Sequence, residues 1–303
     1  MKNRRWRIGS AVTAAVAVGV AGVLGLHSLV PGWLGTAIDS GLPWFGVVLP
    51  LLLGASVVRR SRWAFVVSLV PSILWTVMFG PVLVPRSGAD HHDLRVATLN
   101  LGATNPEPRT ALAAVAEADP DVLVLQELTV GNRAAAGLAL DRTWIHHTVT
   151  GTVGIWSKVP LSDMSPVDIG IGWTRALRVT VPTQDGPLRI YVAHLASARP
   201  AATAERNQTV ASLARTIAAD ESPRLLLAGD LNTTTTDRQF AAFEPLEDTQ
   251  VEAGSGFGFT WPSKLPVMRP DHILQRGMST QRSWVVEAPG SDHRAAFAEL
   301  DTA

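Results

Sequence analysis

The sequence predicts an α/β protein that carries a membrane region at its N-terminus. Three observations support this prediction: uncharged apolar runs before residue 87, opposite net charges in the two parts of the chain, and recurring strand-like segments after residue 94. The chain has 303 residues, of which 47% are hydrophobic and 17% are charged, and soluble chains usually have about 25% charged residues. It contains no cysteine, which excludes a disulfide scaffold, a Cys-ligated zinc site and a thiol nucleophile.

The formal net charge of zero conceals a strong asymmetry. Residues 1–87 contain eight basic residues and one acid, Asp39, which gives +7. Residues 88–303 contain 18 basic and 25 acidic residues, which gives −7. The two parts are therefore expected to lie in different surroundings.

Three uncharged apolar runs lie in the first part, at 9–30, 42–58 and 63–84. A helix needs about 20 apolar residues to cross a bilayer, so the first and third runs, with 22 residues each, have the required length. The second run has 17 and is either a short span or a buried hairpin arm. Cleavage of 9–30 as a signal peptide is disfavoured, because that run exceeds the usual 7–15 residues and two more runs follow. We expect a bundle of three transmembrane helices within 1–87.

The basic residues predict the orientation of these spans. They precede the first run and lie between the second and third, whereas the loop 31–41 has none. Because basic residues favour the cytoplasmic side, the N-terminus is expected in the cytoplasm. Three crossings then place a short polar linker, 88–93, and the domain 94–303 outside. The basic residues concerned are Lys2, Arg4, Arg5, Arg7, Arg59, Arg60 and Arg62.

Domain 94–303 alternates strand-like and helical patterns. The sequences VLVL at 122–125 and LLLA at 225–228 lack polar alternation, so these strands are expected to be buried on both faces. Helical periodicity covers 109–118 and 203–219. The expected strands are 95–101, 121–128, 152–157, 174–181, 188–195, 224–231, 270–274 and 297–300.

Polar side chains follow or end many of these strands. Each alone has an ordinary structural explanation, such as a turn, a salt bridge or a buried histidine. A carboxylate placed directly after a buried strand is costly unless it is paired. The ordered set therefore favours one cleft in which a cation neutralises the acids. The set is Asn100, Glu127, His194, Asp230, Asn232, Asp271, His272, Asp292 and His293.

Four short motifs occur in a characteristic order: TLN at 98–100, QE at 126–127, GDLN at 229–232 and SDH at 291–293. Their order and spacing resemble the endonuclease/exonuclease/phosphatase superfamily, which includes DNase I, abasic-site endonucleases, sphingomyelinases and inositol-polyphosphate phosphatases. The resemblance spans residues 94–300. It implies a DNase I-like four-layer sandwich, in which two packed mixed β-sheets are flanked by helices and the site lies at one rim.

The resemblance also implies a metal site. Glu127 corresponds to the main Mg²⁺ ligand, assisted by Asn100 and Asp292, and Mn²⁺ is an alternative ion. Such oxygen ligands suit Mg²⁺, which keeps several of its waters. Arg175 is expected to assist in binding the substrate.

The remaining motif residues are implied to act on a phosphate. Asp230 resembles the residue that orients or deprotonates the attacking water, and Asn232 the one that holds a phosphate oxygen. His293 and His194 resemble the two histidines that contact the phosphate, and Asp271 orients His293. The implied reaction is metal-assisted attack of water on phosphorus.

The prediction of the substrate class rests on features in which this sequence differs from the nuclease branches. Those branches place a tyrosine in the site, whereas the single tyrosine here, Tyr191, lies within an expected strand. The domain has a net charge of −7 and only two lysines, Lys158 and Lys264, whereas DNA binding depends on basic residues. Binding of nucleic acid is therefore not expected.

The layout also resembles membrane-anchored members of the superfamily linked to glycopeptide-antibiotic resistance. This resemblance implies an extracytoplasmic polyprenyl (undecaprenyl-type) pyrophosphate phosphatase of the cell membrane, with a lipid-linked pyrophosphate as its partner. The alternatives are a membrane-tethered nuclease or phosphodiesterase, a sphingomyelinase-like phospholipid phosphodiesterase, and a non-catalytic membrane scaffold.

The orientation can be tested with reporter fusions. Alkaline phosphatase fused after Ala303 should be active, because three crossings from a cytoplasmic N-terminus carry the C-terminus outside. An inactive phosphatase together with a fluorescent cytoplasmic GFP fusion at the same position would contradict this topology.

Overall fold

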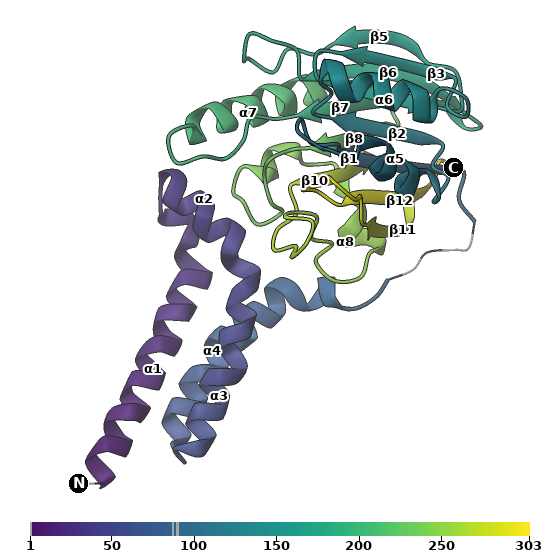
Figure 1. The fold of residues 1–303 in the computed structure, drawn as a ribbon. Coiled ribbons are helices and arrows are strands. Elements are labelled where there is room, and N and C mark those ends of the chain that lie inside the picture. The colour runs from purple at the N-terminus through teal and green to yellow at the C-terminus, as the bar shows by residue number, and fades with distance from the viewer. Residues whose placement is uncertain (1, 87, 89–90) are drawn as a thin grey trace. The chain divides into compact units, whose positions relative to one another are not determined.

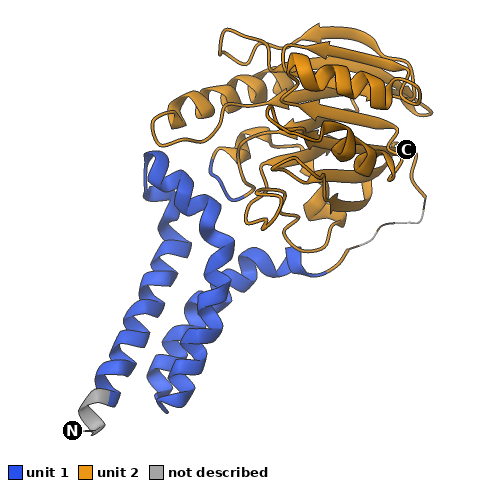
Figure 2. Cartoon of the chain, in the orientation of Figure 1, with its two compact units in different colours: residues 1–84, 236–238 blue, residues 85–235, 239–303 orange. Residues whose placement is uncertain are grey.

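The computed structural model describes residues 2–86, 88 and 91–303, and residues 2–5 by their backbone alone (Figure 1). The chain forms two compact units, 1–84 with 236–238, and 85–235 with 239–303 (Figure 2). Residues 89 and 90 of the predicted linker 88–93 lie outside the described residues.

The first unit contains three helical stretches long and apolar enough to cross a membrane: Trp6–Leu29, Gly32–Val58 and Arg62–Leu83. They are built from α1 (Lys2–Leu26), η1 (His27–Leu29), α2 (Gly32–Gly41), η2 (Leu42–Val47), α3 (Val48–Val58) and α4 (Arg62–Leu83). The second stretch has 27 residues rather than the 17 predicted, because residues 32–41 are helical. Their three glycines weaken the helical signal in the sequence.

Asp39 is the single acid of this unit's helices and lies within the second stretch. Its carboxylate is fully buried and contacts His27 Nδ1 at 2.6 Å and Arg238 Nε at 2.8 Å, both within the same unit. Partners of this kind are needed, because an uncompensated charge in an apolar span is costly.

Two six-stranded sheets form the second unit. Only the β1–β2 and β7–β8 pairs are parallel among the described strands, so both sheets are mixed. In order across the sheet, the first contains β11 (Ser279–Val286), β12 (Ala295–Asp301), β1 (Leu94–Asn100), β2 (Val122–Gln126), β4 (Val153–Ser157) and β3 (His146–Thr150). The second contains β5 (Ser162–Pro166), β6 (Ala176–Thr183), β7 (Gly186–His194), β8 (Leu225–Asp230), β10 (Asp271–Arg276) and β9 (Glu247–Asp248).

The two sheets pack face to face through alternate residues of their strands. Val122 and Val124 of β2 face the core between the sheets, together with Leu226 of β8. Leu123 and Leu125 face the opposite side of β2. The VLVL sequence is therefore buried on both faces, as predicted.

Helices cover the outer faces of both sheets. Helices α5 (Pro108–Ala116) and α6 (Val130–Leu140) pack on the first sheet, and α7 (Thr203–Ala218) packs on the second (Figure 1). Shorter elements are η3 (Phe240–Phe243) and α8 (Thr249–Ala253). The predicted four-layer arrangement of helices and two packed mixed sheets is confirmed.

Strand register brings the sequence motifs together. In the first sheet Asn100 pairs with Gln126, which immediately precedes Glu127. In the second sheet Asp230 pairs with His194 on one side and Asp271 on the other. Gly229 has φ +151°, and a Cβ there would lie 1.9 Å from the Ala193 carbonyl oxygen. The glycine of GDLN therefore permits the close approach of β7 and β8.

Candidate active site

Asn100 joins the two sheets at the motif-bearing strand ends. Its amide nitrogen donates to Asp230 Oδ2 in the second sheet at 2.9 Å, and to Oε1 of Glu127, the residue after β2 of the first sheet, at 3.2 Å. Its amide oxygen accepts from the Gly102 N–H at 3.0 Å. The residue is only 1% exposed. Two acidic motifs distant in the sequence thus converge on one amide.

Glu127 is held in an uncommon conformation directly after β2. Its φ is +56°, a region that non-glycine residues enter rarely. Asn132, in the capping box at the start of α6, donates to the Glu127 carbonyl at 2.9 Å. The carboxylate accepts the Ala103 N–H at 2.7 Å, and its side chain is 31% exposed. Glu127 therefore presents a fixed carboxylate that solvent reaches.

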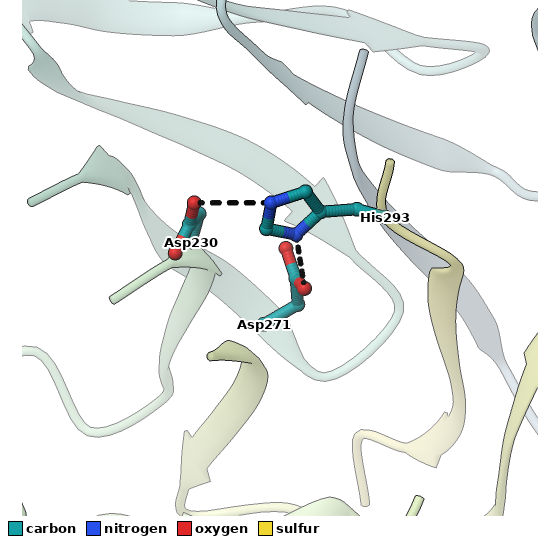
Figure 3. Close-up of side chains that lie close together, drawn as sticks. All are labelled: Asp230, Asp271 and His293. Atoms are coloured by element: carbon teal, nitrogen blue, oxygen red, sulfur yellow. Dashed lines mark hydrogen bonds and ion pairs between the residues drawn. The ribbon is translucent and has the colours of Figure 1, made fainter. Parts of the chain in front are cut away.

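Asp230, Asp271 and His293 form a buried cluster (Figure 3). His293 Nδ1 lies 2.8 Å from Asp271 Oδ2, and its Nε2 lies 3.9 Å from Asp230 Oδ2. Thr260 Oγ1 donates to Asp271 Oδ2 at 2.5 Å. The other oxygen, Asp271 Oδ1, has no hydrogen-bond partner among the described residues. The predicted pairing of Asp271 with His293 is present.

The environment of this cluster shifts its protonation equilibria. Burial, and next the Asp271 carboxylate, raise the pKa of Asp230 to about 7. Burial lowers the pKa of His293, but Asp271, Asp230 and Asp292 together raise it to about 10. Two carboxylates beside one imidazolium favour a charged histidine and oppose ionisation of both acids.

His194 and Arg175 complete one wall of the site. His194 Nε2 lies 3.6 Å from Asp230 Oδ2 and 3.8 Å from Glu127 Oε1. Burial, then the charges of Arg175 and His293, lower the pKa of His194 well below its usual value. Burial also lowers the pKa of Arg175, whereas Asp230 and Glu127 oppose that shift. At neutral pH the wall therefore combines a neutral imidazole with a guanidinium cation.

Asn232 and Asp292 border the cluster. Asn232 Nδ2 donates to the Leu195 carbonyl at 3.0 Å, and the Asn232 backbone N–H donates to Asp230 Oδ1 at 2.9 Å. Asp292 is exposed, and its Oδ2 accepts from Trp261 Nε1 at 3.3 Å. A cleft of about 770 Å³ opens beside Asp292, and Lys264 is among its lining residues.

The donor set of the site suits a divalent cation. The Asp271 oxygen without a partner and the raised pKa of Asp230 indicate excess negative charge that a cation would neutralise. Glu127 and Asp292 both lie near the 102–103 turn: the first accepts from Ala103 N, and Asp292 Oδ1 lies 3.7 Å from the ideal Cβ position of Gly102. Hard carboxylate oxygens accessible to water suit Mg²⁺. Asn100, Glu127 and Asp292 stay the predicted ligands.

Some contributors carry weak or no sequence signals. Ser291 donates to the Asn100 carbonyl at 2.7 Å and accepts the His293 N–H at 3.0 Å, which ties two motifs together. It belongs to the SDH motif, which could have revealed it. Asn132 belongs to the capping pair Thr129–Asn132 at the start of α6, a local pattern that could have revealed it. Thr260 stands in no recognisable pattern.

Two motif-like residues have structural roles. His272 faces away from His293: its Nε2 contacts the Thr233 carbonyl at 2.9 Å, and its Nδ1 lies 3.6 Å from Asp248. Tyr191 Oη donates to Asp220 Oδ2 at 2.6 Å on the α7 side of the second sheet. The chain's one tyrosine is therefore bound outside the cluster.

Comparisons with known proteins place this site in a family. The model of the endonuclease/exonuclease/phosphatase family matches residues 97–293. The chain belongs to this family. The family fold implies a hydrolase of phosphoester bonds, and family enzymes use divalent metals. No match to a curated protein is found.

Solved structures share the family fold. A humanized TDP2 of D. rerio has a TM-score of 0.59 at 17% identity, covering 69% of this chain and 99% of that chain. A mannosyl-6-phosphatase of Bacteroides thetaiotaomicron has a TM-score of 0.56 at 17% identity, covering 68% and 99%. A beta toxin of Staphylococcus aureus has a TM-score of 0.51 at 13% identity, covering 68% and 99%. These identities show the fold alone.

Metal dependence tests the predicted ligand set. Glu127→Ala should abolish turnover, because it removes the chief predicted ligand. His293→Ala should lower kcat on the order of 100-fold or more, as loss of one transition-state donor commonly does. Rates are measured with and without Mg²⁺ and EDTA, and the exposed Glu221→Ala serves as the charge-matched control. Full activity in EDTA, or a wild-type rate for Glu127→Ala, would refute the assignment.

The Asp271 carboxylate should control the alkaline limb of the pH–rate profile. The predicted role of His293 as a donor to the phosphate needs its charged form, so activity should fall as pH rises through the His293 pKa, which is about 10. Asp271→Asn removes the negative charge that raises this pKa, so the limb should move to lower pH by about one unit or more.

The exposed Asp163→Asn controls for loss of one carboxylate elsewhere in the domain. An alkaline limb that does not move in Asp271→Asn would show that Asp271 has no effect on the charge of His293.

Proposed function

We propose that this protein is a membrane-anchored, metal-dependent phosphohydrolase of lipid-linked pyrophosphates, with a polyprenyl (undecaprenyl-type) pyrophosphate as substrate. The observation that carries the chemistry is the convergence of Glu127, Asn100, Asp230 and His293 at one rim of the sandwich. The candidate spans support the lipid substrate, because helices of this length and composition would tether the site to a bilayer.

A divalent cation near Glu127 would polarise a phosphoryl oxygen and stabilise the leaving oxyanion. Asp230 is suited to accept the proton of the attacking water, because burial and the Asp271 carboxylate raise its pKa above that of an ordinary carboxyl. His293, held as an imidazolium by Asp271, donates from Nε2 toward the phosphate. Asn232 and Arg175 contribute further N–H donors for phosphate oxygens, and His194 stays a neutral hydrogen-bonding group.

The tether supports a substrate that is itself held in the membrane. A polyprenyl tail would confine the pyrophosphate to the surface at which the domain is tethered and raise its local concentration, as linking two groups does. A soluble polyanion gains nothing from this confinement. The cleft beside Asp292 has room for a group larger than one phosphate, and Lys264 supplies a cation there.

We further propose that the domain acts outside the cytoplasm, on the basis of the basic residues around the spans. Resemblance to membrane-anchored members linked to glycopeptide-antibiotic resistance supports both the location and the lipid substrate.

A nuclease is the second candidate. A TDP2 of D. rerio complexed with single-strand DNA product shares the fold, with a TM-score of 0.58 at 19% identity. The charge of −7 and the position of Tyr191 outside the cluster weigh against this candidate. A sphingomyelinase-like phosphodiesterase is a third, since a beta toxin shares the fold.

The substrate classes can be separated with purified full-length protein in detergent. Prenyl pyrophosphate should be hydrolysed to the monophosphate and inorganic phosphate faster than DNA is cleaved at matched phosphate concentration. Phosphate release, plasmid nicking and choline-phosphate release from sphingomyelin are measured in parallel.

Asp230→Ala and Glu127→Ala should remove the lipid activity together, and Glu221→Ala should retain it. Nicking of supercoiled plasmid without phosphate release from the lipid would replace the proposed function with the nuclease.

A further inference from the structure

Trp173 is an exposed aromatic residue beside the site. It lies in the loop between β5 and β6, and it is 55% exposed. Tryptophan offers a large apolar surface, and this one stays in contact with solvent. Trp173 has no role in the proposed hydrolytic chemistry.

The loop that carries Trp173 is anchored just before the tryptophan. Val167 and Ile169 are buried against the outer face of the second sheet. Gln208 of α7 donates to the Gly170 carbonyl at 3.2 Å, and Gly170 N donates to Asp168 at 2.7 Å. The exposure of Trp173 therefore occurs in a segment whose neighbouring residues are fixed.

Arg175 connects this tryptophan to the cluster. Its guanidinium carbon lies 4.9 Å from the centre of the Trp173 ring. Its carbonyl accepts the His194 N–H at 2.8 Å, and its charge interacts with Asp230 and Glu127. The Nε atom is buried and has no hydrogen-bond partner among the described residues. The guanidinium thus contacts the ring and lies within electrostatic range of the acids.

Arg175 and Trp173 can therefore contact different parts of one substrate. A guanidinium can stack its face on an aromatic ring while its N–H groups bind a phosphate at its edge. A phosphate bound by Arg175 would therefore have the indole as its neighbour, and the group esterified to that phosphate would contact it.

We propose that Trp173, stacked on Arg175, is a specificity-determining residue that binds the first apolar segment of the group attached to the substrate's phosphate. The inference rests on the proposed function for the identity of that group as a prenyl chain. The inference adds the residue that distinguishes a long apolar substituent on the phosphate from a small one.

The test compares two soluble substrates that share the reacting diphosphate, farnesyl diphosphate and methyl diphosphate, both below the concentration at which they aggregate. Trp173→Ala should lower kcat/KM roughly tenfold for the farnesyl compound, the size of discrimination that apolar contacts give. It should leave the methyl compound within about twofold. Trp173→Phe should restore most of the farnesyl activity, because it keeps an aromatic face.

Arg282→Ala is the control for loss of an Arg–Trp contact elsewhere in the domain. It removes the exposed Arg282 on edge strand β11, whose guanidinium lies 4.7 Å from the Trp284 ring, and it should leave both rates unchanged. Equal losses on both substrates for Trp173→Ala would overturn the proposal, and so would no loss on either. A loss confined to prenyl substrate embedded in vesicles would assign Trp173 to the lipid surface instead.

A wild type that hydrolyses neither diphosphate would refute the proposed function but not this inference. The comparison is then made with bis(p-nitrophenyl) phosphate and methyl p-nitrophenyl phosphate, which differ by one aromatic group. Trp173→Ala should lower the rate for the first compound selectively, and an unchanged ratio between the two would overturn the role of Trp173.

Discussion

The site depends on the burial of two carboxylates, Asp230 and Asp271, on adjacent strands in direct register. Two such charges cannot be accommodated without compensation, and the surrounding groups supply it. His293 pairs with Asp271, and Asn100 reaches across from the other sheet to Asp230. The contacts that stabilise the buried carboxylates also hold the two sheets together at this rim. Removing a member therefore affects both the chemistry and the packing of the strand ends.

Much of the catalytic domain follows from local patterns in its sequence. The runs at 122–125 and 225–228 predicted strands buried on both faces, and α5 and α7 begin within a residue of the predicted helices. The prediction was wrong for residues 32–41, where a helix replaces the expected loop. Packing within the first unit and the partners of Asp39 override the weak helical propensity there. Such tertiary effects are not visible in local composition.

The site was predictable as a set of strand ends but not as a network. Register places Asn100 beside Gln126 and His194 beside Asp230, so the polar residues that end strands had to meet. The contribution of Thr260 depends on a loop 11 residues before Asp271, and that of Ser291 depends on the distant Asn100. The left-handed backbone of Glu127 and Asn232 is likewise set by contacts from other elements, such as Asn132.

The groups proposed to act on the phosphate stand at the ends of paired strands, whereas Trp173 and Lys264 stand on connecting loops. Strand ends tolerate few substitutions. At Gly229, for example, any side chain larger than hydrogen would clash with the Ala193 carbonyl. Loops of this kind accept substitutions and insertions at small cost to folding. The strand ends are therefore constrained in sequence, whereas the loops can diverge. Gene duplicates could acquire new substrates by altering the loops while the groups at the strand ends are retained.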